Sequence, residues 1–266
     1  MAGLVTDGMS SGWATDLAIL ELAGSTIEDH DDHVVVRSAR HPDYHWGNCI
    51  LVSGQDAVEQ PERWLDVFRA AFPDAGWVAI GLDRMPMDAG AWTARDLELE
   101  VDEVLTTREA PRLSPLPESY TARRLSGDDW EQYVARGLRE NARAGTYEPS
   151  EYERFFRARA GEQREMSDRG VAAFFGAFLE GVLVAELGIV RCGHRARFQD
   201  VGTDEAHRRR GLAAHLLGVA AGWAEAEGCD EWVIVTASDN AAGRVYRRAG
   251  FTPDSGVVQA YRFPAR

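Results

Sequence analysis

The stretch His207-Arg208-Arg209-Arg210-Gly211-Leu212-Ala213 joins a strand-like run, residues 197–203, to an amphipathic helix that carries Leu216 and Val219 on its apolar face. A glycine-bearing turn at a helix N-terminus presents unpaired backbone N–H groups, and the helix dipole adds partial positive charge. Arginine side chains add guanidinium donors that suit phosphate oxygens. The stretch therefore predicts an anion-binding turn, and a pyrophosphate is its natural ligand.

Composition narrows the classes of protein that this chain can represent. Its 266 residues are enough for one large domain or two of ordinary size, and a net charge of −14 argues against broad nucleic-acid binding. The chain contains no apolar run as long as the roughly 18 residues of a membrane span. We therefore expect a cytoplasmic protein without nucleic-acid or membrane partners.

All 29 basic residues are arginine, a bias typical of a GC-rich bacterial genome. The absence of lysine excludes a Schiff-base mechanism and a P-loop lysine. Cys49, Cys192 and Cys229 form no CxxC pair, which fits a reducing compartment. The stretch Asp29-His30-Asp31-Asp32-His33 contains metal-ligating residue types but is interpreted as a solvated loop, and no metal is expected.

Three prolines within residues 110–117 indicate an extended linker. We accordingly divide the chain into a domain at 1–110, a linker at 111–117 and a second domain at 118–266. The first domain is expected to contain strands at 33–37, 49–52, 77–82 and 97–105 and a helix at 61–72. The second domain is expected to contain strands at 120–125, 171–178, 182–190, 198–203, 231–236 and 257–263 and helices at 128–141, 150–164, 212–228 and 240–249.

Two motifs in the second domain resemble those of the GNAT superfamily of N-acetyltransferases. The first is Arg208-x-x-Gly211-x-Ala213, and the second is the segment Asn240…Tyr246…Gly250-Phe251. The resemblance covers about residues 118–266. It implies an α/β (α+β) GNAT fold, with a mixed, mostly antiparallel sheet flanked by helices. The domain before it is similar to a smaller, degenerate GNAT-like half, so the chain is expected to be a tandem protein.

The resemblance also implies acetyl-CoA as co-substrate and a set of residues that hold it. Arg208 opens the pyrophosphate turn, and strand residues bind the pantetheine arm. Tyr246 is expected to lie near the thioester sulfur and to protonate the departing thiolate. The cofactor-binding set is Val201, Gly202, Thr203, Arg208, Arg209, Arg210, Gly211, Leu212, Ala213, Asn240 and Tyr246.

The reaction implied is direct attack by a primary amine of a small molecule on the acetyl carbonyl. Removal of the amine proton requires a carboxylate or an ordered water nearby. Asp200 is the first candidate base because it lies on the strand beside the cofactor, and Glu186 on the neighbouring hairpin strand is the second. Gln199 stands where many family members carry a carboxylate. A non-catalytic CoA-binding sensor is the alternative function, and the protein is expected to be a monomer or a homodimer.

Each candidate residue also has a purely structural interpretation. Arg208–Arg210 could be a solvated turn, Tyr246 could be a packing residue, and Asn240 could cap its helix. His207 and His215 are expected at the surface. The aromatic residues Tyr147, Tyr152, Phe155 and Phe156 either line an acceptor pocket or pack against the sheet.

The first domain lacks both motifs. Its first strand–helix connection, Ser53-Gly54-Gln55-Asp56-Ala57-Val58, contains one glycine and no positive charge. We therefore expect a single cofactor site, at Arg208–Ala213, and a structural role for the first domain.

Overall fold

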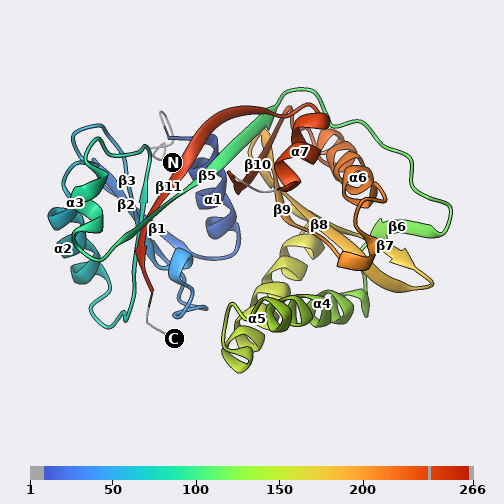
Figure 1. Cartoon of the computed structure of the whole chain (residues 1–266), viewed down its shortest axis with the longest axis horizontal. Coiled ribbons are helices and arrows are strands. Elements are labelled where there is room, and N and C mark those ends of the chain that lie inside the picture. The colour runs from blue at the N-terminus through green and yellow to red at the C-terminus, as the bar shows by residue number, and fades with distance from the viewer. Residues whose placement is uncertain (1–8, 239–240, 264–266) are drawn as a thin grey trace. The chain divides into compact units, whose positions relative to one another are not determined.

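The computed structural model describes residues 9–238 and 241–263, and the chain divides into two compact units (Figure 1). Unit 1 consists of Met1–Val104, Val235–Asn240 and Pro253–Arg266. Unit 2 consists of Leu105–Ile234 and Ala241–Thr252. Each unit has its own hydrophobic core. The described helices include none that is long and apolar enough to cross a membrane.

Unit 1 is built on a sheet with the strand order β1-β2-β3-β4-β11. Strand β2 is antiparallel to both β1 and β3, strands β3 and β4 are parallel, and β11 is antiparallel to β4. Its elements are α1 (Ser11–Leu22), β1 (Thr26–Asp29), β2 (His33–Arg37), η1 (His45–Gly47), β3 (Cys49–Val52), α2 (Pro61–Ala71), β4 (Val78–Leu82), α3 (Ala89–Thr93), most of β5 (Glu98–Thr107) and most of β11 (Thr252–Arg262).

The core of unit 1 follows from continuous apolar runs in the sequence. Strands β3 and β4 are buried along their whole length, as expected for parallel strands covered on both faces. Helix α2 buries Trp64, Leu65 and Phe68 on one face. The indole N–H of Trp64 donates to the carbonyl of Ala57 at 2.6 Å, which ties the helix to the loop before it.

The last strand of the chain completes the sheet of unit 1. Strand β11 pairs with β4 from Val258↔Leu82 to Arg262↔Val78, whereas β5, the strand that directly follows α3, lies on the other side of β11. The sequence placed residues 257–263 in the domain at 118–266, and the structure groups Pro253 onward with unit 1. Because this pairing joins residues about 180 positions apart, local sequence patterns carry no signal for it.

Unit 2 has the strand order β10-β9-β8-β7-β6, with helices on both faces of the sheet (Figure 1). Helices α4 and α5 pack on one face, where Phe174 contacts Trp130 and Tyr133, and α6 packs on the other, beside Phe175. Its elements are β6 (Tyr120–Arg124), α4 (Asp129–Ala144), α5 (Pro149–Asp168), β7 (Ala172–Leu179), β8 (Val182–Cys192), β9 (Arg195–Thr203), η2 (Glu205–His207), α6 (Leu212–Ala226), β10 (Glu231–Ala237) and α7 (Ala241–Arg248).

Strand β9 positions the site. It is antiparallel to β8 along its length and parallel to β10 from Arg195↔Glu231 to Arg197↔Val233. The register between β8 and β9 shifts between Glu186 and Gly188, and Asp200 opposite this irregularity has a φ of 48°. A β-bulge of this kind re-aims side chains beside functional sites.

The predicted fold class is confirmed: mixed sheets are flanked by helices, and every strand and helix expected in the two domains has a counterpart. Helix α1 and strand β1 were not predicted. Helix α1 buries Trp13 and Leu17, but its sequence has no clear amphipathic period. Predicted Asn240 lies outside the described residues.

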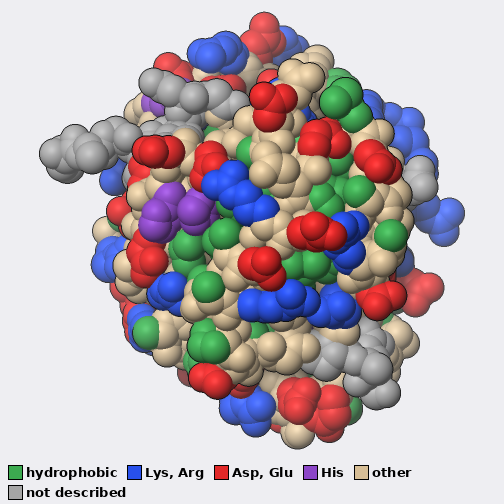
Figure 2. All heavy atoms as spheres, turned by 90° about the vertical axis from the view of Figure 1, so that its left-hand side faces the viewer, with side chains coloured by type: hydrophobic (Ala, Val, Ile, Leu, Met, Phe, Trp, Pro, Cys, Tyr) green, Lys and Arg blue, Asp and Glu red, His purple; other side chains and the backbone are tan. Residues whose placement is uncertain are grey.

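The face of unit 1 shown in Figure 2 carries acidic and basic side chains interspersed, with histidine side chains side by side. The rings of His30 and His33 stack with centroids 4.3 Å apart, and His33 pairs with Asp32. Within residues 9–238 and 241–263, no group of three or more metal-ligating side chains is arranged to hold a metal ion.

Candidate active site

The arginine turn after β9 leads directly into the N-terminus of α6. Gly211 is the N-cap residue with φ 81°, and Arg209 also has a positive φ, 61°. Arg208, Arg209 and Arg210 are exposed. Because Gly211 has no side chain and Leu212-Ala213-Ala214 contains no acid, the first backbone N–H groups of α6 are left to an external acceptor. The turn therefore fits a phosphate group.

Side-chain hydrogen bonds hold this turn in place. His207 Nδ1 shares a hydrogen bond of 2.9 Å with the hydroxyl of Tyr120 on β6, and Arg208 Nε donates to the carbonyl of Thr203 at 3.2 Å. His215 on α6 donates from Nδ1 to the carbonyl of Ser114 at 2.6 Å. His207 and His215, expected at the surface, are thus half-buried anchors of the turn and of residues 111–117.

The strand residues expected to bind the pantetheine arm precede this turn. Val201, Gly202 and Thr203 are partly exposed, and Gly202 and Thr203 pair with Glu186 and Ala185 on β8. Strand β9 pairs with β10 over Arg195–Arg197, so Val201, Gly202 and Thr203 lie beyond this pairing. A strand in this position can offer backbone groups to a ligand.

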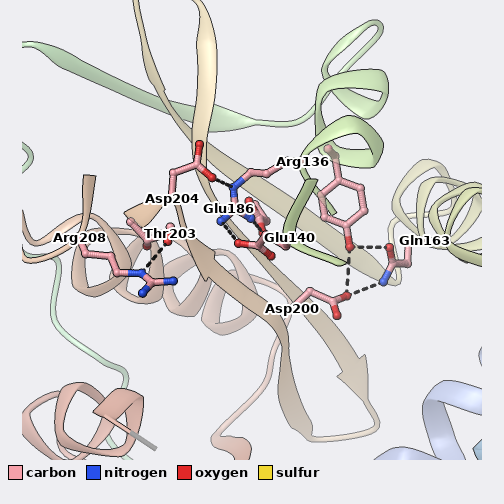
Figure 3. A network of polar contacts seen from close by, with 9 residues as sticks. Arg136, Glu140, Gln163, Glu186, Asp200, Thr203, Asp204 and Arg208 are labelled. Atoms are coloured by element: carbon pink, nitrogen blue, oxygen red, sulfur yellow. Dashed lines mark hydrogen bonds and ion pairs between the residues drawn. The ribbon is translucent and has the colours of Figure 1, made fainter. Parts of the chain in front are cut away.

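Arg136 on α4 lies at the centre of the polar network beside this strand (Figure 3). Its guanidinium forms ion pairs with Glu186, with Glu140 at 2.7 Å (Nη2 to Oε1) and with Asp204 at 2.9 Å (Nε to Oδ1). The side chain is only 1% exposed. A single buried guanidinium thus connects helix α4, strand β8 and the end of β9.

Glu186 is the most perturbed carboxylate of the network. It is 6% exposed, its Oε1 accepts from Arg136 Nη1, and its Oε2 is buried without a hydrogen-bond partner among the described residues. Burial raises the pKa of Glu186 to about 8, and the nearby Glu140 reinforces the rise while Arg136 opposes it. A carboxyl group with a pKa near neutrality and a free oxygen suits general-base chemistry.

Asp200, the first candidate base, is held differently. Its carboxylate accepts from Arg159 at 2.8 Å, from Gln163 at 2.6 Å and from the Tyr133 hydroxyl at 3.2 Å (Figure 3 shows the last two). The donors come from helices α4 and α5, so the Asp200 carboxylate links both helices to β9. The geometry favours Glu186 over Asp200 as the proton acceptor, because the oxygens of Asp200 are already engaged.

Tyr246 on α7 lies in the core of unit 2 on the same face of the sheet as α6. Its ring meets Phe251 edge-on at 6.5 Å, and Phe251 in turn meets Phe198 on β9 at 5.8 Å. The residue is 5% exposed, and burial raises the pKa of its hydroxyl to about 12. The phenol is therefore fully protonated near neutral pH and can serve only as a proton or hydrogen-bond donor there.

Three of the predicted acceptor-side aromatics form a series of ring contacts from the connection between α4 and α5 into the two helices. Tyr147 stacks on Tyr152 at 5.5 Å, Tyr152 stacks on Phe156 at 5.4 Å, and Phe156 reaches Tyr133 at 5.4 Å. The series runs from the exposed Tyr147 to the buried Tyr133. Phe156 thus packs in the interior, whereas an acceptor pocket lined by the exposed Tyr147 stays a prediction.

Unit 1 has a different arrangement at the connection between β3 and α2. The backbone N–H of Gly54 donates to the carboxylate of Asp83 at 3.0 Å, and α2 begins with Pro61, which has no N–H. A carboxylate of the protein thus takes a donor that a phosphate would need. This contrast supports the expectation of one cofactor site.

Arg136, Glu140 and Asp204 were missed by the sequence reasoning. A signal for Arg136 was present, because it lies on the buried side of α4 among Tyr133, Val134 and Gly137. An arginine among apolar positions of an amphipathic helix requires a buried anionic partner. Asp204 carried no comparable signal.

Residues 131–251 match the model of the Acetyltransferase (GNAT) family. No curated protein matches the chain. Among solved structures, similar folds occur in a conserved protein of unknown function from Staphylococcus epidermidis ATCC 12228 (11% identity, 90% of this chain and 94% of that chain, TM-score 0.66) and in a GCN5-related N-acetyltransferase from Kribbella flavida (19%, 96% and 98%, 0.65). A tandem GNAT protein from the clavulanic acid biosynthesis pathway is also similar (14%, 98% and 97%, 0.55).

Residues 131–251 thus resemble the GNAT acetyltransferases in sequence, and over nearly its whole length the chain has a fold similar to that of a tandem GNAT protein.

Proposed function

We propose that this protein transfers an acetyl group from acetyl-CoA to a primary amine of a small molecule by direct attack. The family match supports acetyl transfer, and the family uses acetyl-CoA. The observation that carries the proposal is the buried Glu186. Its Oε2 has no hydrogen-bond partner among residues 9–238 and 241–263, and its raised pKa equips it to take a proton beside the predicted cofactor strand.

The arginine turn would hold the cofactor. The backbone N–H groups of Arg209–Ala213 would bind the pyrophosphate, and Arg208, Arg209 and Arg210 would compensate its charge. Val201, Gly202 and Thr203 would orient the pantetheine arm through their backbone groups. When bound, acetyl-CoA supplies the thioester carbonyl that the amine attacks.

Glu186 and Tyr246 would move the protons. Glu186 accepts the proton that the attacking amine releases, and Tyr246 delivers a proton to the departing thiolate. The raised pKa of Glu186 brings its proton affinity close to the working pH, while the raised pKa of Tyr246 keeps its hydroxyl protonated until it is needed. An acceptor that enters as an ammonium gives up two protons from its nitrogen in forming the amide. Glu186 would pass both on, so that one replaces the proton that Tyr246 gives to the thiolate and one is released to solvent.

Release of free CoA in the presence of a panel of amines tests the proposal. Acetyl-CoA consumption that depends on an amine, together with acetylated product in mass spectrometry, is expected. Tight CoA binding without turnover on any amine would favour the sensor alternative. Absence of CoA binding would contradict both.

A further inference from the structure

The network around Arg136 contains more negative than positive charge. Three carboxylates, from Glu140, Glu186 and Asp204, pair with one guanidinium. When all are ionised, two negative charges are in excess. The Asp200 carboxylate next to it is balanced separately by Arg159. The excess therefore belongs to the Arg136 cluster.

The free oxygen of Glu186 is an independent indication that a ligand binds here. Oε2 is buried without a hydrogen-bond partner among the residues that the structure describes, on a side chain that is 8% exposed. A buried acceptor left without a donor is energetically unfavourable. A cationic N–H donor would satisfy this oxygen, and its positive charge would stabilise the ionised form of a carboxyl group whose pKa burial has raised.

The cluster is open to a ligand on one side. Glu140 is 45% exposed and Asp204 is 22% exposed, although Arg136 at the centre is buried. Burial raises the pKa of Tyr152, and the charge of Glu140 adds to the rise. The rings of Tyr147 and Tyr152 stack with centroids 5.5 Å apart, and aromatic faces favour a cation and its alkyl chain.

We propose that Glu140, Asp204 and Oε2 of Glu186 form the acceptor subsite and that the acceptor is a diamine or polyamine without a carboxylate. One ammonium would lie at Oε2 of Glu186, and a second would lie toward Glu140 and Asp204, which matches the two excess charges. This inference rests on the proposed amine acetylation, and it specifies the substrate class.

A matched series of probes tests the subsite through binding alone. The probes are 1,4-diaminobutane, butylamine and 4-aminobutanoate, which share a four-carbon chain and carry two, one and no net positive charges. Each is titrated by calorimetry into the full-length protein, with and without saturating CoA so that no turnover occurs. The same titrations are made with Glu140→Gln, with Asp204→Asn and with Glu131→Gln as control.

Glu131 is a suitable control because it lies on the same helix nine residues before Glu140, about 13 Å away along the axis. Its ion pair with Arg157 is exposed, so its loss has little effect on stability. Circular dichroism verifies that each variant is folded. If Glu140→Gln does not fold, the Asp204→Asn variant still tests the subsite.

The expected affinity order is diamine, then butylamine, then 4-aminobutanoate, with at least about a tenfold difference between the first and the last. Glu140→Gln and Asp204→Asn should each reduce the diamine affinity several-fold more than the butylamine affinity, and Glu131→Gln should change neither. Equal affinity for diamine and 4-aminobutanoate, or no diamine binding in either condition, would overturn the subsite. CoA titrated alone tests the proposed function separately, because loss of CoA binding with intact diamine selectivity contradicts acetyl transfer and leaves the subsite standing.

Discussion

Gly202 and Glu186 are paired across β9 and β8 so closely that a Cβ atom at residue 202 would lie 2.3 Å from Oε1 of Glu186. The same Cβ would lie 2.7 Å from Nη1 of Arg136. Glycine at 202 therefore makes room for the buried ion pair, in addition to the backbone contact with pantetheine that the sequence predicted.

Replacing Gly202 with alanine is expected to separate Arg136 from Glu186. Because both partners are buried, we expect a destabilisation of about 1–3 kcal/mol, measured by chemical denaturation. Gly161→Ala on α5, where an added Cβ meets no atom within 4 Å, is the control and should be neutral or slightly stabilising. Equal stability of Gly202→Ala and the wild type would show that the network is looser than described.

The pH dependence of stability should carry the signature of Glu186. Its pKa is raised in the folded state from 4.5 to about 8, so the folded protein binds more protons between these values. The stabilisation associated with this group is present below the unfolded pKa and is lost as the pH rises toward 8. We therefore expect Glu186→Gln to gain stability relative to the wild type between pH 5 and pH 9 in urea unfolding. A constant difference across this range would contradict the raised pKa.

The pH dependence of activity should also reflect the titration of Glu186. Activity should rise with pH, whereas the stability contributed by this group falls. As a base, Glu186 works only when ionised, so kcat/KM should rise with pH through an apparent pKa near 8. The groups facing it are Arg136, Glu140, Asp200, Asp204 and the Tyr133 hydroxyl. Asp200→Asn should preserve this limb of the profile, and its loss in that variant would assign the base to Asp200.

Tyr246→Phe tests whether the Tyr246 hydroxyl donates a proton to the departing thiolate. The substitution keeps the edge-on contact with Phe251 and removes only the hydroxyl. We expect kcat to fall about 10²-fold or more, with the affinity for acetyl-CoA changed little, in a steady-state assay of CoA release. Equal kcat in the variant and the wild type would reduce Tyr246 to a packing residue.

The turn at Gly211 offers a pair of substitutions that are matched in shape and differ in charge. Asn and Asp both tolerate a positive φ and can cap a helix, but only Asp adds negative charge at the N-terminus of α6. Gly211→Asp should weaken acetyl-CoA binding at least about tenfold more than Gly211→Asn, as measured by calorimetry. Similar affinities would indicate that the phosphates bind elsewhere.

The sequence contained enough to predict the fold class and the strand–turn–helix at Arg208–Ala213, because each rests on a local pattern. The role of Tyr246 as proton donor stays a prediction. The sequence could not show that β11 pairs with β4, since that pairing depends on contacts between distant segments. The ranking of Asp200 and Glu186 also required the structure. Both are acidic residues on adjacent strands. Only the structure shows that side chains of α4 and α5 donate to the carboxylate of Asp200, whereas Oε2 of Glu186 has no hydrogen-bond partner among the described residues.

The central claim is that Glu186 removes the proton of an amine that attacks acetyl-CoA. It is tested most directly by single-turnover acetylation of an accepted amine, comparing the wild type with Glu186→Gln at pH 8 with the acetyl-CoA affinity measured alongside. We expect the rate of acetyl transfer to fall about 10²- to 10⁴-fold, with acetyl-CoA bound as tightly as in the wild type. An unchanged rate, or the absence of any amine-dependent transfer by the wild type, would contradict the claim.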